Sequence, residues 1–133
     1  MLAFPKPEPL ALHRAKRKAA RASALDEAYR AVDLRDGGVC RATGRTTRSG
    51  DPDARVRREH HHLAGRHVRP DWRHDTKRIV TLCAEAHQLV ESYALLIEGA
   101  NADGRLLFHW NRDIVPVGKE PFRLKSKRWS QNR

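Results

Sequence analysis

The stretch between Glu59 and Glu91 constrains this chain more than any other part of it. It holds six of the eight histidines and one of the two cysteines, with several arginines interspersed among them. A neutral imidazole binds transition metals and exchanges a proton near neutral pH, so clustered histidines predict a metal site or a general base. Guanidinium groups bind phosphate oxygens with paired hydrogen bonds. The combination predicts metal-assisted chemistry on a phosphodiester.

The charge of the chain supports a partner that carries phosphates. Lys and Arg number 27 against 16 Asp and Glu, which gives a formal net charge of +11. Basic surfaces bind nucleic acid because neutralised phosphates release condensed counterions. The N-terminus lacks the apolar run of a secretory signal, and no stretch approaches the roughly 20 apolar residues of a membrane span. We therefore expect a cytoplasmic protein that binds DNA and does not contact a membrane.

Three motifs follow one another along the chain and together resemble the HNH, or His-Me finger, family of nucleases over residues 35 to 91. The central one is an acidic residue, one further residue, a His-His pair and an aliphatic residue, which are Glu59, His60, His61-His62 and Leu63 here. The others stand where the family has Arg-Asp-x-Gly-x-Cys-x-x-Cys-Gly and Asn-Leu-x-x-Leu-Cys-x-x-Cys-His. They read Arg35-Asp36-Gly37-Gly38-Val39-Cys40-Arg41-Ala42-Thr43-Gly44 and Arg78-Ile79-Val80-Thr81-Leu82-Cys83-Ala84-Glu85-Ala86-His87, with Glu91 four residues further on.

The resemblance implies an α+β fold: a small ββα-metal (HNH) finger with an N-terminal helix and a C-terminal β-hairpin. Its strands would run from about Arg57 to Leu63 and from Ile79 to Leu82, with a helix from about Ala84. The implied activity is metal-dependent endonucleolytic cleavage of DNA to 5′-phosphate and 3′-hydroxyl ends. The cofactor would be one divalent ion, namely Mg2+, Mn2+, Ni2+ or Zn2+.

The resemblance also implies the roles of the site residues. His61, His87 and Glu91 would hold the metal, His62 would act as general base and Arg66 would contact the phosphate. Glu59 and Arg78 occupy supporting positions. Neighbouring side chains of a strand point to opposite faces, so His61 and His62 have different tasks and His60 shares the face of His62. His87 and Glu91 share one helical face, although Glu91 could equally be an exposed helix charge.

Two departures from the family pattern affect these expectations. Thr43 and Ala86 replace the second cysteine of each pair, so Cys40 and Cys83 cannot complete a tetrahedral zinc site. We therefore expect no structural zinc and two thiols in a packed contact. Arg78 stands where the family has asparagine, and an arginine cannot accept a hydrogen bond. Either neighbours such as Asp75 hold the loop backbone instead, or catalysis is impaired.

The rest of the chain divides into three parts. Residues 1–22 are expected to form a basic, partly flexible arm, residues 23–115 the nuclease domain and residues 116–133 a basic tail. A helix is expected from about residue 24 to 35, with Leu25, Ala28, Tyr29 and Val32 on its buried stripe. Residues 45–58 read as an exposed loop. Strands at 94–98 and 105–110 read as a hairpin, with Leu106, Phe108 and Trp110 sharing a buried face.

Basic residues in both tails and in the loop after the histidine pair are candidates for binding the phosphate backbone. They are Arg14, Lys16, Arg17, Lys18, Arg69, Arg73, Lys125, Lys127 and Arg128. The basic arm could instead be a solvated helix and the basic tail a solubilising one. Trp72 would either stack on a base or close the base of its loop. The alternative functions are a degenerate finger that binds DNA without cutting it, or an accessory subunit of a phage or mobile-element complex.

Overall fold

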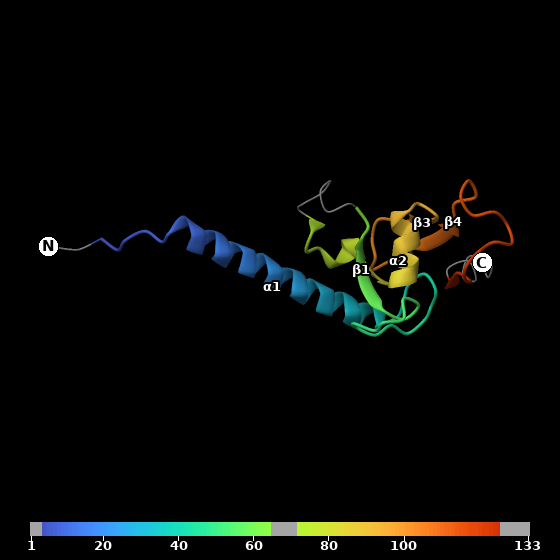
Figure 1. Ribbon diagram of the computed structural model, residues 1–133, viewed down its shortest axis with the longest axis horizontal. Coiled ribbons are helices and arrows are strands. Elements are labelled where there is room, and N and C mark those ends of the chain that lie inside the picture. Colours follow the sequence, from blue (N-terminus) through green and yellow to red (C-terminus); the bar gives the residue numbers. More distant parts are fainter. Residues whose placement is uncertain (1–3, 65–71, 126–133) are drawn as a thin grey trace.

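The protein is a small α+β protein with an N-terminal helix and two small antiparallel sheets, as expected from the sequence at that level. The computed structural model describes residues 4–64 and 72–125. Figure 1 shows the elements in chain order. They are α1 (Leu10–Asp36), β1 (Arg58–His62), the 3-10 helix η2 (Thr76–Arg78), β2 (Ile79–Cys83), α2 (Ala84–Glu91), β3 (Leu95–Glu98) and β4 (Leu107–Trp110).

Helix α1 is much longer than the helix expected from about residue 24. It begins directly after Pro9 and passes through Ser23 without interruption. Its first half is rich in Ala, Leu, Arg and Lys, which are strong helix formers, so no capping residue is needed near position 23. The helix ends at Gly37, whose φ of 66° is the left-handed conformation usual after a helix C-terminus. Among the described residues, neither this helix nor a shorter one combines the length and hydrophobicity that a membrane crossing requires.

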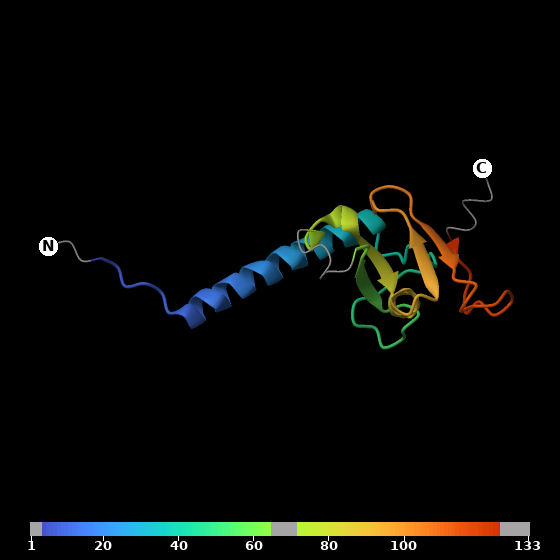
Figure 2. The ribbon, with the colours of Figure 1, turned by 90° about the horizontal axis from the view of Figure 1, so that it is seen from above.

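The first half of α1 projects away from the body of the molecule (Figure 1, Figure 2). All residues from Leu10 to Ser23 are exposed. Packing begins in the second half, where Ala28 and Val32 are buried against Ile79 with Tyr29 beside them. The expected apolar stripe of the helix is therefore confirmed, and it attaches α1 to β2.

Strands β1 and β2 pair antiparallel, and α2 follows β2 without a loop. The register places His61 opposite Val80 and His62 opposite Ile79. Every residue of β2 is buried, which agrees with its continuous apolar run. The Cys83 side chain caps α2 by accepting a hydrogen bond from the Ala86 N–H. This cap begins the first turn of α2 directly at the end of β2.

The expected C-terminal hairpin is present as β3 and β4, which pair antiparallel. Leu106, Phe108 and Trp110 are 5%, 3% and 6% exposed and share the buried face, as the alternating pattern predicted. Trp110 also packs against Phe122, with 5.1 Å between ring centroids. These side chains join the main core under β2 and α2.

Asp36 ties the end of α1 to the rest of the body. Its carboxylate accepts hydrogen bonds from Arg35, from Arg41 and from the Thr81 N–H at distances of 2.8–3.0 Å. Burial raises the pKa of this carboxyl, but the hydrogen bonds from Arg35, Thr81 and Arg41 outweigh burial and hold the pKa below its usual range. A charged Asp36 is therefore part of the folded structure.

The segment between α1 and β1 is a loop, but it is not uniformly exposed as expected. Thr47 is only 2% exposed, and its hydroxyl donates to the Gly38 carbonyl at 2.6 Å. Arg58 in turn donates to the Thr47 hydroxyl at 2.9 Å and to the Thr47 carbonyl at 2.9 Å. The polar composition suggested a solvated loop, whereas these hydrogen bonds fold the chain back onto the start of β1.

Candidate metal centre

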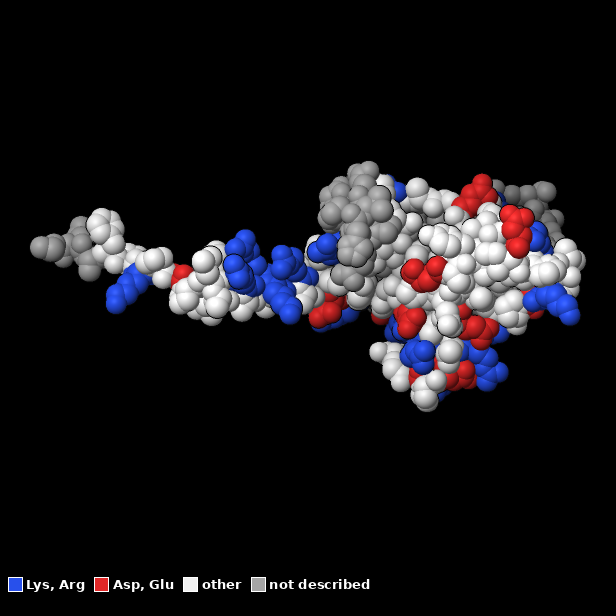
Figure 3. Space-filling model, turned by 45° about the horizontal axis from the view of Figure 1, so that its top comes forward, with Lys and Arg blue, Asp and Glu red and all other residues white. Residues whose placement is uncertain are grey.

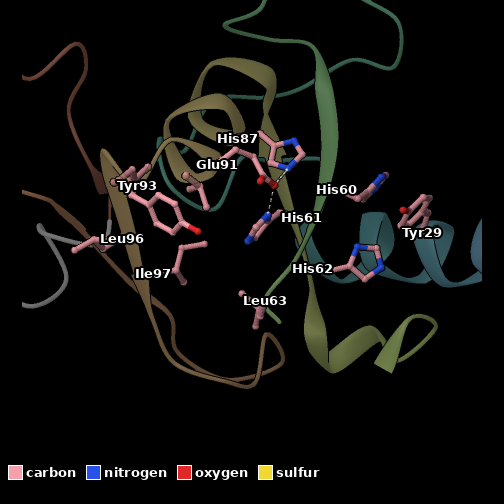
Figure 4. Close-up of a pocket in the computed structure, with 12 residues that line it drawn as sticks. Tyr29, His60, His61, His62, Leu63, His87, Glu91, Tyr93, Leu96 and Ile97 are labelled. Atoms are coloured by element: carbon pink, nitrogen blue, oxygen red, sulfur yellow. Dashed lines mark hydrogen bonds and ion pairs between the residues drawn. The ribbon is translucent and has the colours of Figure 1, made fainter. Parts of the chain in front are cut away.

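Three potential metal ligands converge between β1 and α2. The Nδ1 atom of His61 lies 3.4 Å from Oε1 of Glu91, and Nε2 of His87 lies 3.2 Å from the same oxygen. One ligand atom from each of the three side chains falls within 4.8 Å of the other two. Figure 4 shows His61 pointing from the strand toward His87 and Glu91 on the helix. Among the described residues, this is the one group of three or more such side chains close enough to hold an ion.

Local geometry explains why these three meet. Glu59 and His61 are two apart on β1 and so project from the same face, which lies against α2. His87 and Glu91 are four apart on α2, which places one side chain above the other on a single helical face. The sequence prediction took these positions from the family resemblance and used the same two periodicities to place them on shared faces.

His61 is suited to be a metal ligand because it stays neutral. Its side chain is 15% exposed. Burial, together with the positive charges that His87 and His62 can carry, lowers its pKa to about 4, although Glu91 opposes this shift. A neutral imidazole keeps a lone pair for a metal ion at physiological pH.

Glu59 fixes the orientation of His87. The Nδ1–H of His87 donates to Oε1 of Glu59 at 2.9 Å. In a neutral imidazole the lone pair is then on Nε2, which faces the Glu91 carboxylate at 3.2 Å. Two acceptors at that distance need a cation between them, either a proton or a metal ion. This carboxylate–histidine arrangement is common behind metal-bound histidines, and the residues present therefore fit a divalent ion.

The donor set indicates the class of ion. Two imidazoles and one carboxylate suit divalent first-row metals such as Mn2+, Ni2+ and Zn2+, while the carboxylate also tolerates Mg2+. Glu91 is 64% exposed at its side chain, so the ligand group is open to solvent on this side. An open position is what a catalytic rather than a structural metal site requires.

The opposite face of β1 lies against α1. His60 stacks on Tyr29 with 4.2 Å between ring centroids, and its Nε2 lies 2.7 Å from Oδ1 of Asp33. His62 makes an edge contact with Tyr29 at 6.2 Å and is 8% exposed. The structure thus places His62 on the face of His60, as expected from strand alternation, and its ring points away from His61 (Figure 4).

A backbone contact sets the tautomer of His62. Its Nε2 lies 3.1 Å from the carbonyl oxygen of Arg73, and a carbonyl can only accept a hydrogen bond. The proton of the neutral ring is consequently on Nε2, and Nδ1 carries the lone pair. His62 also lines the cavity that contains His61 and His87.

Arg78 joins the segment before β2 to the β3–β4 loop. Its guanidinium stacks over Trp72 at 4.0 Å from the ring centroid and donates to the Ala100 carbonyl. Asp75 caps η2 by accepting from the Lys77 N–H at 3.0 Å and pairs with Arg78 at 4.0 Å. These contacts connect the segment before β2 with the β3–β4 loop. Trp72 thus lies against the Arg78 guanidinium, and its role in base stacking or in closing the loop stays a prediction.

The two cysteines lie next to each other in the core, as expected. Both are free and buried. A hydrogen bond from Cys83 lowers the pKa of the Cys40 thiol to about 5, and the same contact together with burial raises the pKa of Cys83. Thr43 also hydrogen-bonds Cys40, and Ala86 contacts the Cys83 sulfur. Cys40, Thr43, Cys83 and Ala86 are therefore adjacent and offer two thiols between them, and the absence of structural zinc stays a prediction.

The predicted DNA-binding residues are placed as follows. Arg14, Lys16, Arg17 and Lys18 are exposed on the projecting half of α1, where Lys16 pairs with Glu8. Figure 3 shows lysines and arginines gathered along this helix, whereas both charges are interspersed on the body. Lys125 is exposed, and Arg73 is half-buried near His62. Arg66, Arg69, Lys127 and Arg128 lie outside the described residues.

Three residues at the site were not among the sequence predictions. Tyr29 was assigned to the core, yet it also supports His60 and His62. Asp33 fixes His60 and pairs with Arg58. Tyr93 lines the cavity beside Glu91. Tyr29 and Asp33 are four apart and share a helix face, so the helical spacing could have identified them. Tyr93 belongs to no sequence motif that could have identified it.

Comparisons with known proteins do not assign this chain to a family. No family model matches the chain, no curated protein matches it, and no solved structure matches it.

Proposed function

We propose that this protein is a metal-dependent DNA endonuclease of the HNH type. The observation that carries the proposal is the convergence of His61, His87 and Glu91, with Glu59 behind His87, in a chain of net charge +11. A group with an open position for substrate suits hydrolysis, and a strongly basic chain suits a phosphodiester substrate.

The order β1, β2, α2 supports the proposed ββα-metal finger. The histidine pair is on the first strand, and the remaining ligands are on the helix that follows the second strand. This placement agrees with the resemblance to the HNH family. The role of the missing asparagine would be taken by Asp75 and Arg78, which hold the loop backbone before β2.

The chemistry would be divided among the residues by their position. His61, His87 and Glu91 would hold one divalent ion, which supplies a Lewis acid for the charge that develops on the phosphate in the transition state. His62 would accept the proton of the attacking water at Nδ1, because its Nε2–H is directed to the Arg73 carbonyl. Arg66 would add positive charge to the phosphate.

The projecting half of α1 would bind the DNA backbone. Its basic side chains are exposed, and the helix extends away from the body that carries β1 and α2 (Figure 1). A helix in this position could follow a phosphate backbone beyond the cleavage site. It would contribute affinity that falls with salt and carries no sequence preference.

One observation favours a second candidate, a DNA-binding protein that does not cut. His62 is 8% exposed and points away from the three candidate ligands. A general base must reach the water whose proton it abstracts. In this alternative the histidines are structural, and the basic helix remains the functional surface. An accessory subunit would share these features but would not act on naked DNA.

Incubation of supercoiled plasmid with the purified protein tests the proposal. The reactions contain Mg2+, Mn2+ or Ni2+, or EDTA in place of a metal, and compare the parent with His61→Ala and His62→Ala. His109→Ala is the matched control, because His109 is an exposed histidine on β4 and does not line the cavity.

We expect metal-dependent nicking that is lost in EDTA, in His61→Ala and in His62→Ala and is unchanged in His109→Ala. Cleavage that survives in His61→Ala would contradict the metal centre. Binding of DNA without cleavage under every metal would favour the non-cutting alternative. Failure both to bind and to cut naked DNA would favour the accessory subunit.

A further inference from the structure

Tyr93 has a backbone conformation that tyrosine rarely adopts. It directly follows Ser92, the C-cap of α2, and its φ is 62°. Among the described residues it is the one non-glycine residue with positive φ. The position after a helix C-cap is usually glycine, because a Cβ in the left-handed conformation is strained. Backbone strain of this kind often accompanies a functional site.

Core packing does not explain why position 93 is a tyrosine. Tyr93 is 70% exposed, so its ring adds little to the core. Its backbone is held on both sides, since its N–H donates to the Val90 carbonyl at 3.1 Å and its carbonyl accepts from Asn111 at 3.0 Å. A glycine would satisfy the same backbone contacts without strain. The backbone contacts therefore do not account for the tyrosine side chain at this position.

The ring stands at the mouth of the cavity that contains the metal centre. In Figure 4 the hydroxyl end of Tyr93 points toward His61. The same cavity is lined by His61, His87 and Glu91 on one side. Four half-buried apolar side chains, those of Leu63, Val90, Leu96 and Ile97, form the apolar part of the lining, which also includes Leu95 and, toward the other face of β1, His60, His62 and Tyr29.

The cavity is larger and more apolar than a phosphodiester requires. Its volume of about 570 Å3 is within the range of sites for small ligands. A phosphate at the metal centre would occupy the polar side and leave the apolar side for a second, flat group. One nucleotide has both parts, an anionic phosphate and an aromatic base.

We propose that the apolar side of this cavity takes one unstacked nucleobase, which stacks on Tyr93 while the adjoining phosphate lies at His61, His87 and Glu91. This inference rests on the proposed function, because that function places the phosphate. A base inside a duplex is stacked on its neighbours and cannot enter the cavity, so the favoured substrate is single-stranded DNA or a site with an unpaired base. The apolar wall lacks directional hydrogen-bond groups, so the stacking tolerates any base.

Binding measurements with Tyr93 variants test the inference. Fluorescence anisotropy measures affinity for a labelled single strand and for a duplex of the same sequence. The protein carries His62→Ala to suppress cleavage, and Mn2+ is present. Tyr93→Ala removes the ring, Tyr93→Phe keeps it, and Leu34→Ala is the control, since Leu34 is 85% exposed on α1 and does not line the cavity.

We expect Tyr93→Ala to weaken binding of the single strand by roughly 10-fold or more, within the range of base–aromatic stacking. Duplex affinity should not change, and Tyr93→Phe and Leu34→Ala should bind both DNAs as the parent does. A strand with 2-aminopurine beside the bound phosphate should lose fluorescence on binding, and this quenching should vanish in Tyr93→Ala. Equal affinity of parent and Tyr93→Ala for the single strand, or an equal loss for both DNAs, would overturn the inference.

The plasmid assay separates this result from the proposed function. Metal-dependent nicking together with a Tyr93→Ala variant that binds single strands normally would leave the nuclease intact and refute base stacking. A selective loss of single-strand affinity without metal-dependent cleavage of either the plasmid or the single strand would refute the nuclease and support the stacking site.

Discussion

Oε1 of Glu59 accepts a hydrogen bond from Nδ1 of His87 at 2.9 Å, across the gap between β1 and α2. The contact joins the second residue of a strand to the fourth residue of a helix 28 positions later. It turns the lone pair of His87 toward Glu91, so the geometry of the candidate metal centre depends on a residue that is not a ligand.

Glu59→Gln should weaken divalent-metal binding while the fold persists. Glutamine keeps the shape of the side chain but loses the charge that orients and polarises His87, and loss of such a partner typically costs about 10- to 100-fold in metal affinity. Isothermal titration calorimetry with Mn2+ and Zn2+ measures the effect. Glu98→Gln, an exposed glutamate at the end of β3, is the control and should titrate as the parent does. Unchanged affinity in Glu59→Gln would show that the contact is only structural.

Glu91→His should change which metal supports activity. An imidazole is a softer ligand than a carboxylate, so the variant should favour Ni2+ and Zn2+ and respond less to Mg2+ and Mn2+. Plasmid nicking under each metal, expressed as a ratio to the Ni2+ rate, measures the shift. If the ratios match those of the parent, Glu91 does not contact the ion and is a solvated helix charge.

The convergence of His61, His87 and Glu91 could be predicted because the family resemblance gave the three positions and short-range periodicity placed their side chains on facing surfaces, whereas their role as metal ligands stays a prediction. A strand of period two separates His61 from His62, and a helix of period 3.6 aligns His87 with Glu91. The meeting of the two elements follows from the β1–β2 pairing, which the motif order already indicated. The same reasoning placed His60 and His62 on a common face.

Other features depend on contacts that a pattern does not encode. A helix was expected from about residue 24, but the preceding residues have strong helix propensity and continue the helix toward the N-terminus. Thr47 was assigned to an exposed loop because the segment is polar. Its burial depends on hydrogen bonds with Gly38 and Arg58, which a local pattern does not encode. The left-handed conformation of Tyr93 could not be read from its residue type, which predicts the opposite.

Asp36→Asn should destabilise the fold by about 3 kcal/mol, because it removes the negative charge between Arg35 and Arg41. The pKa of Asp36 is below its ordinary 3.8 in the folded protein, so the carboxylate contributes stability above that pH and loses it as pH falls through the folded pKa. The parent should therefore lose stability in this acidic range, and Asp36→Asn should lose less. Urea denaturation at several pH values measures both. Asp113→Asn, at an exposed carboxylate, should behave as the parent does.

Arg78→Ala should destabilise the protein by about 1 to 2 kcal/mol, because it removes the stacking on Trp72 and the hydrogen bond to the Ala100 carbonyl. The Ala102 N–H, which donates to the Lys77 carbonyl at 2.6 Å, should exchange faster with solvent. Hydrogen exchange read by NMR measures this amide. Arg55→Ala removes an exposed arginine paired with Asp53 and should change neither quantity. If the Ala102 amide exchanges as slowly in Arg78→Ala as in the parent, the segment before β2 and the β3–β4 loop are held together without the guanidinium.

Tyr93→Gly should stabilise the folded protein, although the same change removes the ring that we propose stacks on a base. Relief of a positive φ in a side-chain-bearing residue gains about 1 to 2 kcal/mol, and the greater freedom of glycine in the unfolded chain offsets about 0.5 to 1 kcal/mol of this. The net gain should be about 0.5 to 1 kcal/mol, since the 70% exposed ring contributes little packing. Tyr93→Ala keeps the strain and should not gain stability, and Ser92→Gly, at an ordinary φ of −91°, should lose it. Chemical denaturation of the three variants measures these differences. A Tyr93→Gly variant that is both more stable and weaker in single-strand binding would show that the strain is retained for the ligand, whereas a less stable variant would show that the ring supports the fold.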